Sequence, residues 1–161
     1  MKLPSPLTCL MAVCFSAASA TCYAQDPLPT FDQVRSQYAQ SKDLTRVSFL
    51  YRRCAALQLN VAALLVRKKQ TKAASDYEAL AQHYMLMSEV VDREIDLYQR
   101  NKISKPGETV NLAVKHLSEI YAQRMRDNKS KRGEYFADDV VLEKEMDECL
   151  KPDVLAKSLG R

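Results

Sequence analysis

The amino-acid sequence predicts an all-α protein: a small antiparallel helical bundle of about five helices, with one disulfide, after a cleaved signal peptide. Three observations lead to this prediction. The chain of 161 residues has only three glycines, and its long stretches of Ala, Leu, Gln, Glu, Lys and Arg favour helix over strand. Apolar residues recur every three or four positions, which is the spacing of one helix face. The chain also begins with an apolar run that ends in small residues.

That apolar run is typical of a secretory signal peptide. Met1-Lys2 precede the apolar residues 7–15, and small residues follow at 16–20. Cleavage fits the small-residue rule after Ala20 and after Ala24. We favour Ala24, because cleavage there removes three of the five cysteines and leaves an even pair, which suits an oxidising compartment.

The predicted mature chain is long enough for one domain with a core and too short for two ordinary ones. No transmembrane segment is expected, because the leading run is too short and no later segment has about 18 consecutive apolar residues without a charge. We therefore expect residues 1–24 to be a signal peptide and residues 25–161 to be a single helical domain. The expected location is the periplasm, or otherwise the outside of the cell. The alternative interpretation of the apolar run is an N-terminal core helix. Such a helix would contain two early prolines and would have no polar face, so we prefer the signal peptide.

The first two helices are predicted from a cap and from a long apolar seam. Thr30 and Gln33 have the spacing of a capping box, which predicts a short helix through about Gln40. The second helix, from about 43 to 69, has the strongest periodicity of apolar residues, which form one continuous seam along it. Further apolar residues lie off its seam, so we expect this helix at the centre of the bundle. Its seam residues are Val47, Leu50, Cys54, Leu57, Val61 and Leu64.

A third helix is predicted from about 72 to 100, with its seam out of phase with the second. In one unbroken helix the two seams would point to nearly opposite sides. A chain reversal within 67–72 turns both seams inward, so we predict an antiparallel hairpin and not one long rod. The apolar pattern of this third helix contains Tyr77, Leu80, Tyr84, Met87, Val91, Ile95, Leu97 and Tyr98.

The C-terminal third of the chain predicts two or three more helices. Residues 105–107, Lys-Pro-Gly, mark a break, and a fourth helix is expected from about 109 to 126. The polar run 127–133 is interpreted as an exposed loop. Asp138 or Asp139 is expected to cap a fifth helix through Leu150. A short, frayed helix is expected over 154–159.

The two cysteines of the predicted mature chain predict a disulfide. Cys54 lies on the seam of the second helix, and Cys149 lies on the apolar side of the fifth. They meet if the fifth helix crosses the second, and export favours their oxidation. Two buried free cysteines are the alternative.

No residue is predicted to be catalytic or to bind a cofactor or a metal. Three glycines cannot provide a glycine-rich phosphate loop. His83 and His116, the only histidines, lack the Glu-x-x-His spacing of di-metal bundles, and no Cys-x-x-Cys-His sequence attaches haem. No Gly-x-Ser-x-Gly turn exposes a nucleophilic serine.

The charge balance argues against nucleic acid as a partner. Removing Lys2 with the signal peptide leaves 23 basic and 20 acidic side chains, a net charge of +3. The basic residues gather in 67–72 and 124–132, which would suit an anionic envelope surface, although solvated helix ends explain them as well.

Aromatic and thioether side chains of the third helix are the candidate interaction surface: Tyr77, Tyr84, Met87 and Tyr98. Together with the missing catalytic motifs they predict a protein-binding module of adaptor, chaperone-like or inhibitor/immunity type, with another protein of the same compartment as its partner. Two alternatives stay open at this point. One is a small cell-envelope hydrolase that uses carboxylates, and the other is a protein held at a membrane or wall by its basic segments.

Overall fold

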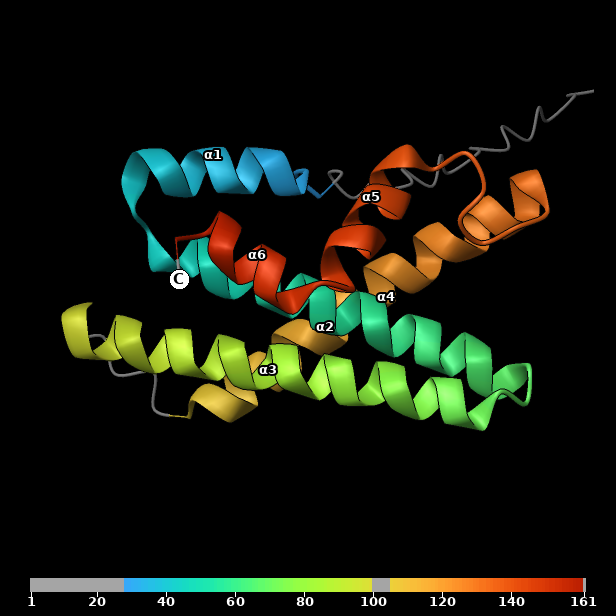
Figure 1. Cartoon of the computed structure of the whole chain (residues 1–161), viewed down its shortest axis with the longest axis horizontal. Helices are drawn as coiled ribbons and strands as arrows, with labels where there is room; N and C mark the ends of the chain where they lie inside the picture. The colour runs from blue at the N-terminus through green and yellow to red at the C-terminus, as the bar shows by residue number, and fades with distance from the viewer. Residues whose placement is uncertain (1–27, 100–104, 161) are drawn as a thin grey trace, which may run out of the picture.

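The computed structural model describes residues 28–99 and 105–160; residues 1–27, 100–104 and 161, and with them the predicted signal peptide, lie outside the described residues. Within the described ranges the chain forms six helices and no strand, which confirms the all-α prediction (Figure 1). The helices are α1 (Phe31–Ser41), α2 (Leu44–Arg67), α3 (Thr71–Gln99), α4 (Pro106–Arg132), α5 (Val140–Cys149) and α6 (Pro152–Ser158).

Helix α2 is the centre of the bundle, as its apolar residues predict. It packs against α1, α3, α4 and α5, and twelve of its residues are buried. Figure 1 shows α3 along one side of α2 and α1, α5 and α6 on the other. Buried apolar side chains from all six helices form one continuous cluster around it.

The predicted hairpin between α2 and α3 is confirmed. The chain reverses at residues 68–70, where Lys69 adopts the left-handed conformation with φ of 60°. The backbone N–H of Gln70 donates to the carbonyl of Leu65 at 2.9 Å and closes the turn. The turn needs no glycine, because one lysine accepts the left-handed backbone at a modest cost.

The start of the bundle follows the sequence closely. Thr30 caps α1 with both bonds of the capping box: its hydroxyl accepts from the Gln33 backbone N–H, and its own N–H donates to the Gln33 side chain at 2.7 Å. Asp43 caps α2 by accepting from the backbone N–H of Thr45.

Helix α4 is longer than predicted, and the expected loop over 127–133 is wrong. The helix begins at Pro106 in its first turn, where the missing proline N–H costs nothing, and it continues to Arg132. Asn128 is buried on its inner side, which anchors the extra turns. Basic side chains in the last turn suit the negative end of the helix dipole, and Gly133 ends the helix with φ of 84°.

The C-terminal helices α5 and α6 fold back across the bundle. Asp139 caps α5 by accepting from the Leu142 backbone N–H. Helix α6 starts at Pro152, two residues earlier than expected. It is not a frayed end, because Leu155 and Leu159 are buried in the common core. The predicted Cys54–Cys149 disulfide is present and links α2 to α5.

Candidate functional site

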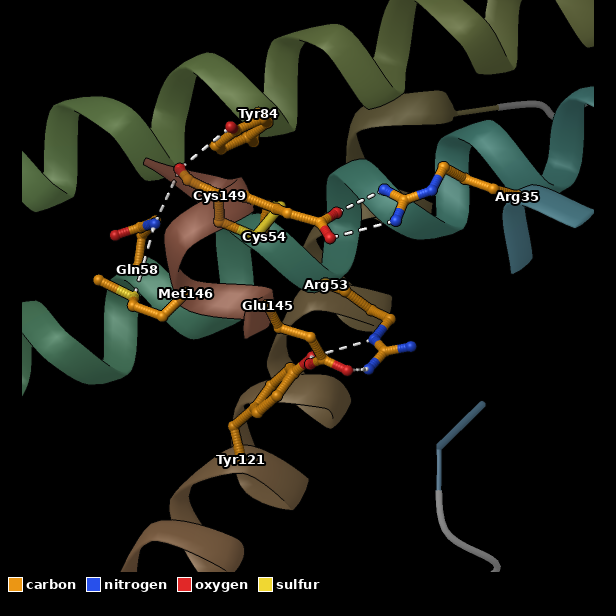
Figure 2. The surroundings of a disulfide bond; sticks show 10 residues. Arg35, Arg53, Cys54, Gln58, Tyr84, Tyr121, Glu145, Met146 and Cys149 are labelled. Carbon is orange, nitrogen blue, oxygen red and sulfur yellow. Dashed lines mark hydrogen bonds and ion pairs between the residues drawn. A yellow bond between two sulfur atoms is a disulfide. The ribbon is translucent and has the colours of Figure 1, made fainter. Parts of the chain in front are cut away.

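The disulfide lies at the crossing of α2 and α5 and is surrounded by polar contacts (Figure 2). The Cα atoms of Cys54 and Cys149 are 5.2 Å apart, and both residues are fully buried. The carbonyl of Cys149 accepts hydrogen bonds from the Tyr84 hydroxyl and from the Gln58 amide nitrogen, each at 3.0 Å. These bonds satisfy a carbonyl at the end of α5 that has no partner within the helix.

A fully buried arginine lies next to the disulfide. The guanidinium of Arg53 donates to the Glu145 carboxylate at 2.5 Å and to the Tyr121 hydroxyl at 2.9 Å, and that hydroxyl donates to Glu145 at 2.6 Å (Figure 2). Arg53 also donates to the carbonyl of Pro29 and lies over the ring of Phe31. One side chain of α2 therefore holds α4, α5 and the segment before α1.

The pKa values of Tyr121 and Tyr84 follow from this setting. Burial is the largest cause that raises the pKa of Tyr121, and the adjacent Glu145 carboxylate raises it further. Burial also raises the pKa of Tyr84, again as the largest cause. Both hydroxyls therefore stay protonated and act as hydrogen-bond donors.

The other two buried carboxylates are also bonded to arginines. Asp92 of α3 accepts from Arg52 at 2.5 Å and from the Ser48 hydroxyl at 2.6 Å, which joins α3 to α2. Asp139 accepts from Arg124 at 2.5 and 2.7 Å. Each of the three buried carboxylates among the described residues is thus bound to an arginine.

The four residues predicted as an interaction surface are not exposed together. Tyr84 is 0% exposed and belongs to the core, so it forms no surface. Tyr77 and Met87 are half-buried and pack against the same core. Tyr98 alone is well exposed, at the end of α3. The reason is that the helix face of Tyr84 turns toward α2, where the two helices pack along most of their length.

A different face of α3 is exposed and partly apolar. It contains Leu86, Val90 and Leu97, which are 60%, 54% and 82% exposed. We call the exposed row along this side of the helix the outer α3 face; its members are Ala79, His83, Leu86, Val90, Arg93 and Leu97. Their spacing alternates between four and three residues, as in the seam of a coiled coil. In Figure 1, α3 forms the lower edge of the bundle.

Acidic residues flank this row on both sides. By helical periodicity Glu89 and Asp96 lie along one edge and Glu94 along the other. Arg93, within the row, lies 3.7 Å from the Glu89 carboxylate. The outer α3 face is therefore a partly apolar row, with His83 and Arg93 among its members and acidic residues along both edges.

Two further features bear on function. Among residues 28–99 and 105–160, no three His, Cys, Asp or Glu side chains are grouped so that they could hold a metal ion, and His83 and His116 are both exposed on separate helices. In the same ranges one helix, α2, is long and apolar enough to cross a membrane by length and composition. It is the core helix of the bundle, and 56% of its most apolar window is buried.

These features define a disulfide-linked helical bundle with buried ion pairs between its helices and with exposed apolar side chains along one side of α3. Comparisons of the chain with protein-family models, with curated proteins and with solved structures found no match.

Proposed function

We propose that this chain is an exported protein-binding module, of adaptor, chaperone-like or inhibitor type, which acts in the periplasm or outside the cell. The observation that carries the proposal is the exposure of Leu86, Val90 and Leu97 along one side of α3. Large apolar side chains aligned at coiled-coil spacing suit the apolar face of a second helix. Exposed apolar strips of this kind are typical of protein interfaces.

The acidic borders favour a partner other than a second copy of this chain. Pairing two copies in parallel would bring Glu89 of one next to Glu94 of the other. Pairing them antiparallel would bring the two Glu89 side chains together. A partner helix with an apolar seam and basic borders avoids both repulsions, so we propose a basic amphipathic helix as the bound element.

Rigidity supports a binding role. The disulfide, the Arg53 cluster and the Arg52–Asp92 pair tie α3, α4 and α5 to α2. A helix face held in this way loses little conformational freedom when it binds.

The test compares two charge insertions at exposed leucines. Leu86→Glu adds a carboxylate to the outer α3 face, and Leu112→Glu adds one to a leucine of α4 that is 70% exposed. Each variant, tagged and expressed with its own leader, is isolated from the cell envelope after crosslinking and measured by native mass spectrometry. We expect a stoichiometric protein complex that Leu86→Glu abolishes and Leu112→Glu retains. A complex that survives Leu86→Glu, or that both variants lose equally, would contradict the proposal.

A further inference from the structure

A hollow with a volume of about 390 Å³ lies between the end of α2 and the loop that joins α4 to α5. Helices α2 and α4 diverge toward their C-terminal ends (Figure 1). We call this hollow the end pocket. Its size lies in the range of about 300–1,000 Å³ that small-molecule sites occupy. Its apolar lining consists of Val61, Leu64, Leu65, Tyr135, Phe136 and Ala137.

The loop wall of the end pocket is held in place by side chains of α4. The Asn128 amide nitrogen donates to the Tyr135 carbonyl at 3.1 Å and to the Asp139 carboxylate at 2.9 Å. Arg132 donates to the Ala137 carbonyl at 2.8 Å. The loop is thus fixed at both ends and in its middle, so the pocket is formed before any ligand arrives.

One cation lines the end pocket, and two more line an adjoining hollow. Lys68 lines the end pocket, and Arg67 and Arg126 line a smaller hollow that shares Leu64 and Tyr135 with it. Among the ion pairs of the described residues none involves these three cations. Arg126 donates a hydrogen bond to the neutral Gln123 side chain.

The same lining contains one carboxylate, Glu134, which is exposed. Lys68 balances this charge within the end pocket, and Arg67 and Arg126 give the adjoining smaller hollow a net positive charge. An unpaired guanidinium presents a planar set of donors that matches a carboxylate or phosphate.

We propose that the end pocket binds a single-chain anionic amphiphile. The acyl chain lies between Leu64, Leu65 and the aromatic rings of the loop, and the anionic head group lies against Arg67, Lys68 and Arg126. A neutral or cationic amphiphile would fill the same volume but would leave these cations without a counter-charge. The pocket uses no residue of the outer α3 face, so the two sites are independent.

The first experiment uses dodecanoate and dodecyltrimethylammonium as probes, each below its critical micelle concentration. Binding to the oxidised mature chain is measured by calorimetry, and methyl NMR reports the location. We expect dodecanoate to bind with 1:1 stoichiometry at least tenfold more tightly than the cationic probe and to shift the methyl signals of Leu64 and Leu65. Equal affinities for the two probes, or no binding of dodecanoate, would overturn the proposal.

A second hollow provides the internal control. It has a volume of about 400 Å³, lies between α2, α3 and α4, and is lined by Met85 and Lys115. Dodecanoate shifts confined to the Met85 methyl would place the ligand there and would overturn the assignment to the end pocket.

Matched charge removals complete the test. Arg67→Gln/Arg126→Gln removes the two cations of the hollow that adjoins the end pocket, and Lys115→Gln/Lys157→Gln removes two exposed cations elsewhere. We expect the first pair to weaken dodecanoate binding at least fivefold and the second to change it less than twofold, with both proteins retaining the wild-type melting temperature. Equal weakening by both pairs would mean that net charge alone attracts the probe, and would overturn the site.

Discussion

Arg53 and Glu145 form an ion pair that is closed off from solvent, with side chains 0% and 3% exposed. Their neighbours in the same two helices, Cys54 and Cys149, form the disulfide. A covalent link and a buried ionic link therefore join α2 to α5 within about one helical turn of each other. The disulfide stabilises the fold by restricting the unfolded chain, whereas the ion pair acts in the folded state. Variants of each pair can therefore measure the two contributions separately.

The disulfide should dominate the stability of the fold. Its two cysteines are 95 residues apart in the sequence, and the chain-entropy model predicts a stabilisation of roughly 4–5 kcal/mol for such a loop. Cys54→Ala/Cys149→Ala should lower the free energy of unfolding by about this amount in urea titrations. Reduced wild-type protein is the control and should match the variant. A loss below about 1 kcal/mol would show that the unfolded chain is constrained in another way.

The Arg53–Glu145 pair should show strong coupling. Arg53→Met leaves the Glu145 carboxylate buried without its cation, and we expect a loss of about 3–5 kcal/mol. Arg53→Met/Glu145→Leu removes both charges and should be less destabilised than the sum of the two single variants. Urea unfolding of all four proteins measures the coupling energy. If the loss in the double variant equals the sum of the two single losses, Arg53 and Glu145 are not coupled, and each is stabilised by its other partners alone.

Acid should destabilise the bundle partly through Asp139. Burial by itself raises the pKa of this carboxyl, but hydrogen bonds from Arg124, Asn128 and the Leu142 backbone N–H outweigh it and lower the pKa below its ordinary value of 3.8. A pKa that is lower in the folded chain stabilises the fold above the unfolded pKa. This stabilisation is lost as the pH falls through the folded pKa.

The measurement is the urea midpoint as a function of pH. Asp139→Asn should lower the midpoint at neutral pH and should flatten its decline below about pH 4. Asp138→Asn is the matched control, because this neighbour is exposed and its left-handed backbone, φ of 55°, suits asparagine. If Asp138→Asn flattens the decline of the urea midpoint equally, the acid sensitivity comes from the total charge of the loop and not from Asp139.

The outer α3 face should contribute nothing to folding. Leu97 is 82% exposed, so Leu97→Gln should change the free energy of unfolding by no more than about 0.5 kcal/mol. Ile95, two residues away, is 4% exposed, and Ile95→Ala should cost about 2–5 kcal/mol. Thermal and urea unfolding give both values. A large loss for Leu97→Gln would mean that this side chain packs within the bundle.

Features that depend on near neighbours were predictable from the sequence. The capping box at Thr30 and Gln33 involves residues three apart, and the hairpin between α2 and α3 follows from the phase of two adjacent seams. The disulfide was predictable because the proposed cleavage leaves two cysteines, each on an apolar helix side. In these cases the interacting groups are close in sequence or few in number.

The end of α4 and the end pocket were not predictable in this way. Residues 127–133 are polar enough for a loop, and their helix depends on Asn128, which bonds to Tyr135 and Asp139 across a turn. No pattern of spacing marks Tyr135 and Phe136 as a wall for α2. Their positions depend on where α4 and α5 pack, and packing joins residues far apart in the sequence.

The sequence by itself determined the helical class, most helix starts, the central role of α2 and the disulfide partners, because helix propensity, caps and apolar periodicity act within a few residues. Only the tertiary structure decided which apolar side chains of α3 stay exposed. Its apolar periodicity predicts the side of Tyr84 as the buried seam, but Leu86, Val90 and Leu97 form a second apolar row, and the sequence does not show whether another helix covers it. Helix α2 covers the Tyr84 side, the Tyr84 hydroxyl donates to the Cys149 carbonyl at the end of α5, and Leu86 is left exposed.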